Sequence, residues 1–149
     1  MQQHDRATYT GVDGNAPTAH ENALPEGEMY FVDGSASIDY ETGEKHVGAA
    51  VVQVEDGEFE VIVQKRLPPH FSAQAAELVA LIEALQTAKV CIVTIYTDSA
   101  YMATTVHGGL ARWGRRGFRR EDRSPVQHAT LLGELSDVLK EPTLVAVVK

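Results

Sequence analysis

One stretch decides how this chain is expected to fold: residues 72–101, with the sequence SAQAAELVALIEALQTAKVCIVTIYTDSAY. It predicts an almost wholly apolar helix, a short connection, and a buried strand that ends in an acid. Ser72 is suited to the N-cap of the helix, and Asp98 follows the strand. Glu77 lies among alanine, valine and leucine, away from the polar side of the helical wheel. Two carboxylates are therefore expected where water is scarce.

A third acid has a similar setting earlier in the chain. Asp33 follows an apolar run in the segment MYFVDGSA, residues 29–36. Clustered carboxylates repel one another unless they are protonated or share cations. Oxygen ligands of this kind suit Mg²⁺ or Mn²⁺ rather than zinc. Two such ions can activate a water and stabilise the leaving oxygen of a phosphodiester, so no protein nucleophile is needed.

Each acid also has an ordinary structural explanation. Asp33 and Gly34 form a common turn pair, and Asp98 is suited to cap a following helix. Glu77 is compatible with the rim of an amphipathic helix. The joint pattern favours a metal site over three unrelated roles. The sequence also contains no Walker-type loop, nucleophile-elbow serine or HExxH motif, which removes several other enzyme classes.

The composition is that of one ordinary domain. The chain has 149 residues, a hydrophobic fraction of 44% and one cysteine, Cys91, which excludes an internal disulfide framework and a multi-cysteine zinc site. No run approaches the roughly 18 apolar residues of a membrane span. The first residues lack the features of a signal peptide. We therefore expect an intracellular setting, in cytoplasm or nucleus, without membrane contact.

Charge is unevenly distributed along the chain. The formal net charge of −8 argues against nucleic-acid binding over the whole surface. A concentrated basic segment is nevertheless suited to local phosphate contact. A solvated loop would have a similar composition, but Trp113 and Phe118, interleaved with the arginines, favour substrate binding or anchoring of the loop. The segment contains six arginines: Arg112, Arg115, Arg116, Arg119, Arg120 and Arg123.

The remaining elements are predicted from periodicity and turn signals. Residues 1–27 are expected to form a flexible leader, because they are polar and poor in large apolar side chains. His107, Gly108 and Gly109 should end a short helix that follows Asp98, and His107 is interpreted as a helix-end residue. A later helix, to about residue 140, should begin with Ser124 as N-cap and Pro125 in its first turn. The expected strands are residues 29–32, 46–54, 58–66, 91–97 and 143–148.

This order predicts an α/β fold. The first three strands can form an antiparallel meander, and the last two can join it in parallel through right-handed crossovers. The natural result is a five-stranded mixed sheet covered by helices.

Three segments resemble the acid-bearing motifs of type 1 ribonuclease H, above all the retroviral domain of murine-leukaemia-type reverse transcriptases. They are FVDGSA, SAQAAELVAL and IYTDSAY, at residues 31–36, 72–81 and 95–101. The proline pair before the helix and the Arg-rich segment after His-Gly-Gly add to the resemblance, which covers about residues 29–149. It implies an RNase H-like fold and cleavage of the RNA strand of RNA–DNA hybrids with Mg²⁺, for which Mn²⁺ can substitute.

The resemblance also implies roles for individual residues. Asp33, Glu77 and Asp98 match the first three catalytic metal ligands. Two positions, Ser72 and Gln74, match contacts to the minor groove. Three positions beside the acids match contacts to the nucleic-acid backbone: Ser35, Ser99 and Tyr101. The basic protrusion that grips the substrate is matched by Arg112, Arg115 and Arg116.

The family pattern continues past the last strand, with a His-bearing loop and a helix that carries a fourth catalytic Asp. This sequence ends at Lys149, and neither Glu134 nor Asp137 matches that acid. We therefore expect residues 28–149 to form an RNase H-like domain truncated at its C-terminus, with a reverse transcriptase or another chain supplying the missing segment.

Two functions stay open from the sequence. One is an endoribonuclease that hydrolyses the RNA strand of hybrids by two-metal-ion catalysis, weakened by the missing carboxylate. The other is a retroelement-derived, catalytically silent nucleic-acid-binding module. The three acids favour the first, and the expected truncation favours the second.

Overall fold

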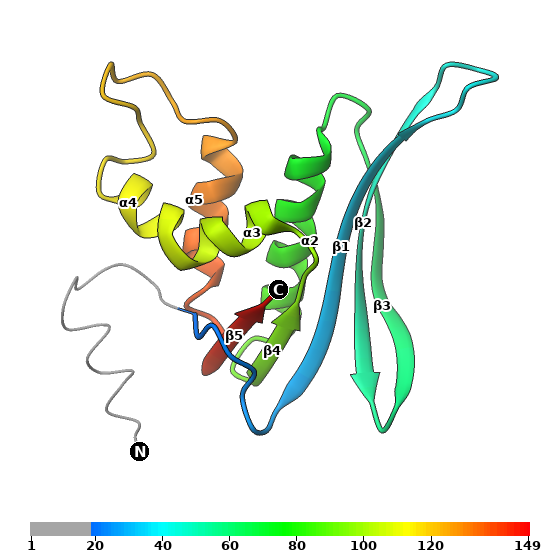
Figure 1. Ribbon diagram of the computed structural model, residues 1–149, viewed down its shortest axis with the longest axis vertical. Helices are drawn as coiled ribbons and strands as arrows, with labels where there is room; N and C mark the ends of the chain where they lie inside the picture. Colours follow the sequence, from blue (N-terminus) through cyan, green and yellow to red (C-terminus); the bar gives the residue numbers. More distant parts are fainter. Residues whose placement is uncertain (1–18) are drawn as a thin grey trace.

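The computed structural model describes residues 19–149, which form a five-stranded sheet with the order β3-β2-β1-β4-β5 (Figure 1). The antiparallel meander consists of β1 (Glu28–Ile38), β2 (Lys45–Glu55) and β3 (Glu58–Leu67). Strand β4 (Ile92–Tyr96) pairs in parallel with β1, and β5 (Leu144–Val148) pairs in parallel with β4. The predicted fold class is confirmed.

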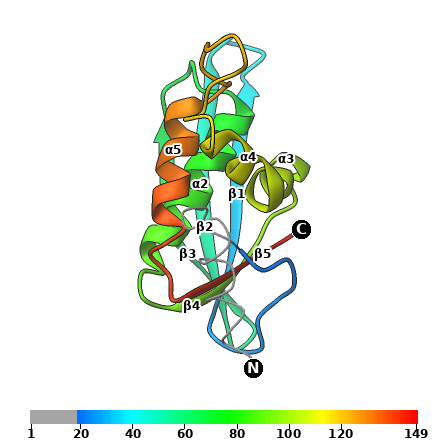
Figure 2. The same cartoon turned by 90° about the vertical axis from the view of Figure 1, so that its left-hand side faces the viewer.

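Helices cover one face of the β1–β3 meander, as Figures 1 and 2 show. None of the helices within residues 19–149 combines the length and the apolar character that crossing a membrane requires. The helical segments are α2 (Ala73–Thr87), α3 (Ala100–Thr104), the π-helical turn η1 (Thr105–Gly109), α4 (Leu110–Gly114) and α5 (Ala129–Val138).

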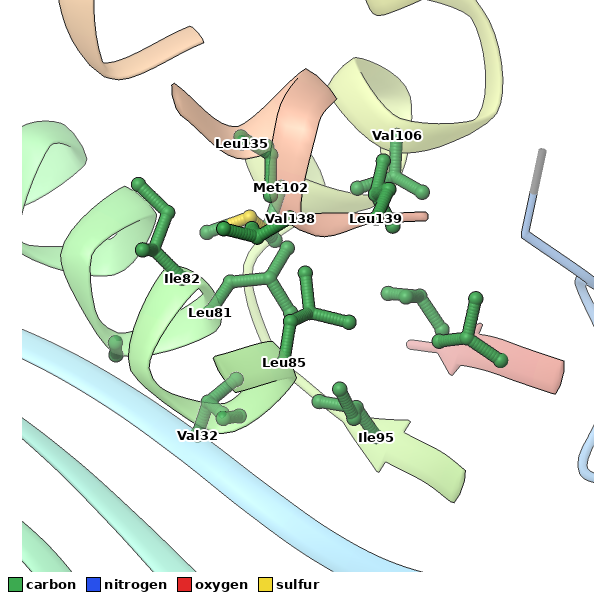
Figure 3. Packing of buried hydrophobic residues seen from close by; sticks show 14 of the residues in the cluster. Val32, Leu81, Ile82, Leu85, Ile95, Met102, Val106, Leu135, Val138 and Leu139 are labelled. Atoms are coloured by element: carbon green, nitrogen blue, oxygen red, sulfur yellow. The ribbon is translucent and has the colours of Figure 1, made fainter. Parts of the chain in front are cut away.

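Helix α2 supplies the centre of the hydrophobic core. Its start is set by Ser72, whose Oγ accepts a hydrogen bond from the Ala75 backbone N–H at 3.0 Å, as expected for an N-cap. Leu78, Leu81 and Leu85 share one side of the helix and are fully buried, and Leu81 and Leu85 pack with side chains of α5, β1 and β4 (Figure 3). Burying each leucine stabilises the folded state by about 1.5–3 kcal/mol.

The opposite face of the β1–β3 meander carries exposed aromatic side chains. Alternation along β1 buries Tyr30 and Val32 and leaves Phe31 43% exposed. Phe31 stacks on Tyr96 with a centroid distance of 5.0 Å and meets the edge of Phe59 at 6.5 Å. No helix of the described residues covers this face.

A segment before β1 is fixed against the sheet. Ala19 is buried, and His20 forms a parallel bridge with Ala146 of β5. Farther along, the Leu24 N–H donates to Thr94 Oγ1 at 3.0 Å. We expected a flexible leader as far as residue 27, and the structure gives its last part these defined contacts. Residues 1–18 of the predicted leader lie outside the described residues.

The expected break at His107, Gly108 and Gly109 was wrong. The chain stays helical from α3 through η1 into α4. A Cβ at Gly109 would lie 2.6 Å from the Trp113 ring, so the glycine makes room for this side chain rather than ending the helix. His107 Nε2 lies 2.7 Å from the Val147 carbonyl oxygen and ties η1 to β5.

The predicted start of the last helix was also wrong. Helix α5 begins at Ala129, after His128 in the left-handed region with φ 63°. The preceding backbone closes a loop instead, because the Val126 N–H donates to the Phe118 carbonyl at 2.9 Å and the Arg120 N–H donates to the Ser124 carbonyl at 2.7 Å.

Val90, between α2 and β4, offers a test of local strain. It is 76% exposed and has φ 57°, which costs a β-branched residue on the order of 1–3 kcal/mol. We expect Val90→Gly to raise the free energy of unfolding by about 1 kcal/mol, since the relief exceeds the added chain entropy of glycine. Urea denaturation measures this change. Val61→Gly, at an exposed position of β3, should lower stability instead, and equal effects at both sites would contradict the strain argument.

Candidate active site

The acid-bearing elements meet where β1 and β4 diverge. Strand β1 pairs with β4 only up to Phe31 and Tyr96, although β1 itself continues along β2. Asp33 therefore lies on β1 just past this separation, paired with Ala50 of β2. Asp98 follows β4 by two residues. Ends of parallel strands beside such a split are where open sheets commonly place ligands.

Helix α2 reaches this point through a backbone contact with β1. A Cβ at Gly34 would lie 2.3 Å from the Glu77 nitrogen and 2.4 Å from the Ala76 carbonyl carbon. Only glycine permits this approach, since real Cβ atoms do not come that close. The contact places the helix turn that carries Glu77 directly beside Asp33 in the fold.

A hydrogen bond joins Glu77 to the segment after β4. Ser99 Oγ donates to Glu77 Oε1 at 2.8 Å. Ser99 Oγ also accepts a hydrogen bond from the Met102 N–H at 3.1 Å. Ser99 therefore caps α3 and holds the Glu77 carboxylate at once. Because Asp98 is the adjacent residue, all three acids belong to one small region.

The acids do not surround a common centre in this arrangement. Asp33 and Asp98 are exposed, and Glu77 is half-buried. Between residues 19 and 149, no three His, Cys, Asp or Glu side chains are placed to hold one ion. The donor set nevertheless consists of carboxylate oxygens, which fits Mg²⁺ or Mn²⁺. The residues therefore fit such an ion in donor chemistry, while their side chains do not converge on one point.

Tyr101 lies beside the acids as a neutral group. Burial raises the pKa of its hydroxyl, a hydrogen bond to Thr105 acts in the opposite direction, and the charge of Glu77 raises the pKa further. The hydroxyl therefore stays protonated at neutral pH. The ring meets the ring of His128 edge-on, with centroids 6.5 Å apart.

The expected minor-groove residues lie at the start of α2. Ser72 is half-buried and Gln74 is exposed. Ser72 Oγ lies 3.5 Å from His128 Nε2, so the loop before α5 returns to this end of α2. Sequence periodicity did not reveal this neighbour, because His128 was placed within a continuous helix.

The Arg-rich segment is separated from the acids. The Arg112 guanidinium lies 5.4 Å from the centre of the Trp113 ring, a favourable cation–π distance. Arg115 and Arg116 are exposed just after α4. Figure 1 shows this segment beyond the helices, on the opposite side of α2 from the β1–β3 meander. The structure therefore does not bring these arginines into the acid region.

Ser35 and Asp33 face a groove along the helix-free side of the meander, which His46 and Arg66 also line. Neither His46 nor Arg66 was expected at the site. No local motif marks them, because they approach Asp33 only through the pairing of three strands.

The five-stranded mixed sheet with helices on one face of its meander defines an α/β domain with three acids beside the β1–β4 split, and comparison with known proteins gives its family. Residues 25–148 match the family model described as RNase H. The chain therefore belongs to the RNase H family, and the resemblance seen in its sequence is confirmed.

Its relatives include retroviral polyproteins. The Gag-Pol polyprotein of Feline leukemia virus is 37% identical over 138 residues, which cover 91% of this chain and 8% of the polyprotein. The Pol polyprotein of Feline endogenous virus ECE1 is 33% identical over 147 residues, which cover 97% of this chain and 14% of that protein. The chain thus spans a small part of the length of these curated relatives.

Solved structures show the same fold. The solution structure of the PFV RNase H domain has a TM-score of 0.67 at 24% identity, with 85% of this chain and 81% of that chain covered. A foamy viral protease-reverse transcriptase in complex with RNA/DNA hybrid has a TM-score of 0.64 at 23% identity, with 91% of this chain and 20% of that chain covered.

The backbone contact at Gly34 predicts a strong effect of one methyl group. Gly34→Ala should lower the free energy of unfolding by about 2–3 kcal/mol, because β1 and α2 must separate. Gly108→Ala is the matched control, since no heavy atom lies within 4 Å of its added Cβ and alanine favours helix. Denaturant titration of both variants checks the difference. A Gly34→Ala protein as stable as the parent would show that the strand and the helix are not held this closely.

Proposed function

We propose that this domain is an endoribonuclease that hydrolyses the RNA strand of RNA–DNA hybrids. The observation that supports the proposal is that Asp33, Glu77 and Asp98 belong to one region beside the split between β1 and β4, although they do not converge on one point. It rests on the Gly34 contact and on the Ser99–Glu77 hydrogen bond. Family membership supports the reaction class.

Asp33, Glu77 and Asp98 would hold the divalent ions, Mg²⁺ or in its place Mn²⁺. When bound, a pair of such ions lowers the pKa of a water and neutralises charge on the reacting phosphate. Within the chain, Ser99 orients Glu77 by donating to Oε1. Tyr101, like any tyrosine, is neutral at pH 7, and burial raises its pKa further; its hydroxyl is suited to donate a hydrogen bond to a phosphate.

Substrate contact is assigned to three groups of residues. Ser72 and Gln74 would meet the minor groove, where RNA presents its 2′-hydroxyls. Ser35 would contact the backbone beside the acids, and the buried Ser99, whose hydroxyl donates to Glu77, would support this contact by holding the carboxylate. Arg112, Arg115 and Arg116 would supply phosphate contacts that do not depend on base sequence. Because the curated relatives are much longer polyproteins, we also propose that a reverse transcriptase or another chain acts beside this domain.

A silent hybrid-binding module is the second candidate. It is favoured by the absence, among residues 19–149, of three side chains placed to hold one ion. In such a module the Ser99–Glu77 hydrogen bond would serve only to join α2 to α3.

Cleavage of a labelled RNA–DNA hybrid, first in Mg²⁺ and then in Mn²⁺, tests the first candidate. We expect RNA fragments from the parent and at least a hundredfold slower cleavage by Asp33→Asn or Asp98→Asn, since each loses a carboxylate needed for charge stabilisation. Parent-like cleavage by Asp98→Asn would refute the metal assignment.

Metal titration provides a readout that does not depend on activity. A ligand that binds the folded state but not the unfolded state raises the unfolding temperature, and the gain in stability grows with the ratio of free ligand concentration to Kd. The parent should gain stability with added Mn²⁺, and Asp33→Asn should gain less. Glu58→Gln, at the far end of the β2–β3 hairpin, should respond as the parent does. Hybrid binding without cleavage and without a metal response would favour the silent module.

A further inference from the structure

A polar trough extends from Asp33 along β2, on the helix-free face of the meander. Its floor is made of the small residues Gly48 and Ala50, so no bulky side chain rises from this part of the middle strand. Side chains of β1 form one wall, side chains of β3 form the other, and a histidine of β2 closes the end. The polar wall and end residues are Asp33, Ser35, Ser37, Gln64, Arg66 and His46.

The register of the three strands explains this shape. Asp33, Ala50 and Gln64 form one row across the sheet, and Ser35, Gly48 and Arg66 form the next row on the same face. Because neighbouring strands are about 4.8 Å apart, the two walls are separated by about 10 Å. A Cβ at Gly48 would already lie 3.3 Å from the Lys65 carbonyl oxygen, so glycine keeps the floor low.

The far end of the trough carries hydrogen-bond donors. Arg66 Nη2 lies 2.6 Å from His46 Nδ1 and 3.2 Å from Glu44 Oε1. A guanidinium has only donors, so Nδ1 accepts and the ring hydrogen is assigned to Nε2. Lys65 points to the other face, where it pairs with Glu83. On the trough side, Glu44 is the carboxylate that pairs with Arg66. Exposed ion pairs of this kind contribute little to stability.

We propose that this trough binds a phosphate of the cleaved strand next to the scissile phosphate, with Arg66 as the main contact and Ser35 and His46 as further donors. The inference rests on the proposed function, because Asp33 at the head of the trough marks where cleavage would occur. Arg66 lies one row beyond Asp33 and on the opposite wall, so these spacings place the two Cα positions about 12 Å apart, and the long arginine side chain can reach into the trough from there. Arginine binds phosphate through two parallel hydrogen bonds, so a phosphate can replace Glu44.

Hybrid affinity as a function of salt tests the contact. Fluorescence anisotropy with a labelled RNA–DNA hybrid, in Ca²⁺ instead of Mg²⁺, should show about tenfold weaker binding by Arg66→Met. The slope of log affinity against log salt should fall by about one, as expected for one lost phosphate contact. Lys140→Met removes the same charge beyond the end of α5 and should change neither quantity. The thermal unfolding midpoint of Arg66→Met should match that of the parent, because this side chain is mostly exposed.

Removing Glu44 should have the opposite effect. Glu44→Gln takes away the carboxylate that competes with a phosphate for Arg66, and should raise hybrid affinity about twofold. This gain should exceed that of Glu58→Gln, which removes one acid at the other end of the hairpin. In an Arg66→Met background the extra gain should disappear. A gain that persists without Arg66 would show a general charge effect and overturn the assignment.

Replacing charged phosphates by uncharged methylphosphonates identifies which strand of the hybrid contacts Arg66. Methylphosphonate linkages in the RNA strand should weaken binding by the parent more than binding by Arg66→Met, whereas such linkages in the DNA strand should weaken both equally. The reverse pattern would overturn the inference.

The two proposals fail separately. A parent that cleaves the hybrid while Arg66→Met binds like the parent would refute the trough alone. A parent that binds without cleaving, with weaker binding by Arg66→Met, would refute the nuclease and keep only the phosphate contact of the trough. A parent that does not bind the hybrid would refute both.

Discussion

The contact between the β1 backbone at Gly34 and the Ala76–Glu77 peptide of α2 is the constraint on which the site depends. It fixes the depth at which α2 lies on the sheet, so Leu81 and Leu85, one and two turns farther on, enter the core. It also places Glu77 beside β1. A larger residue would keep the helix away from the strand, and the core and the acid region would change together.

The same contact determines the direction of the neighbouring side chains. Because Gly34 faces the helix, the strand alternation turns Asp33 and Ser35 to the other face. Asp33 and Glu77 therefore approach the site from two sides of β1, and they can meet only where β1 has parted from β4. This geometry accounts for carboxylates that lie in one region without converging on one point. It also connects the acids to the trough, since Asp33 belongs to both.

Much of this arrangement could be predicted from local sequence. Ser72 and the apolar run after it specify α2, and the apolar segment before Asp98 specifies β4, because local propensity and burial agree there. Errors arose where tertiary contacts decide. Gly109 continues a helix because Trp113 packs against it, and the segment before α5 closes a loop through the Val126–Phe118 hydrogen bond. The trough was invisible for the same reason, since Ser35, Gly48 and Arg66 form a row only through the register of three strands.

The distribution of charge now has a spatial meaning. The chain carries a formal net charge of −8. Three of its acids, Asp33, Glu77 and Asp98, occupy the middle of the proposed substrate path. Basic groups lie to both sides: Arg66 in the trough of the meander, and the Arg-rich segment beyond the helices (Figure 1). A duplex has two backbones, so two separated basic regions can each contact one of them. The three acids would then lie beside a single phosphodiester. Repulsion between the acidic body and nucleic acid would then oppose other binding modes. On this view the negative net charge favours one orientation of the hybrid, in which the strand to be cleaved lies in the trough.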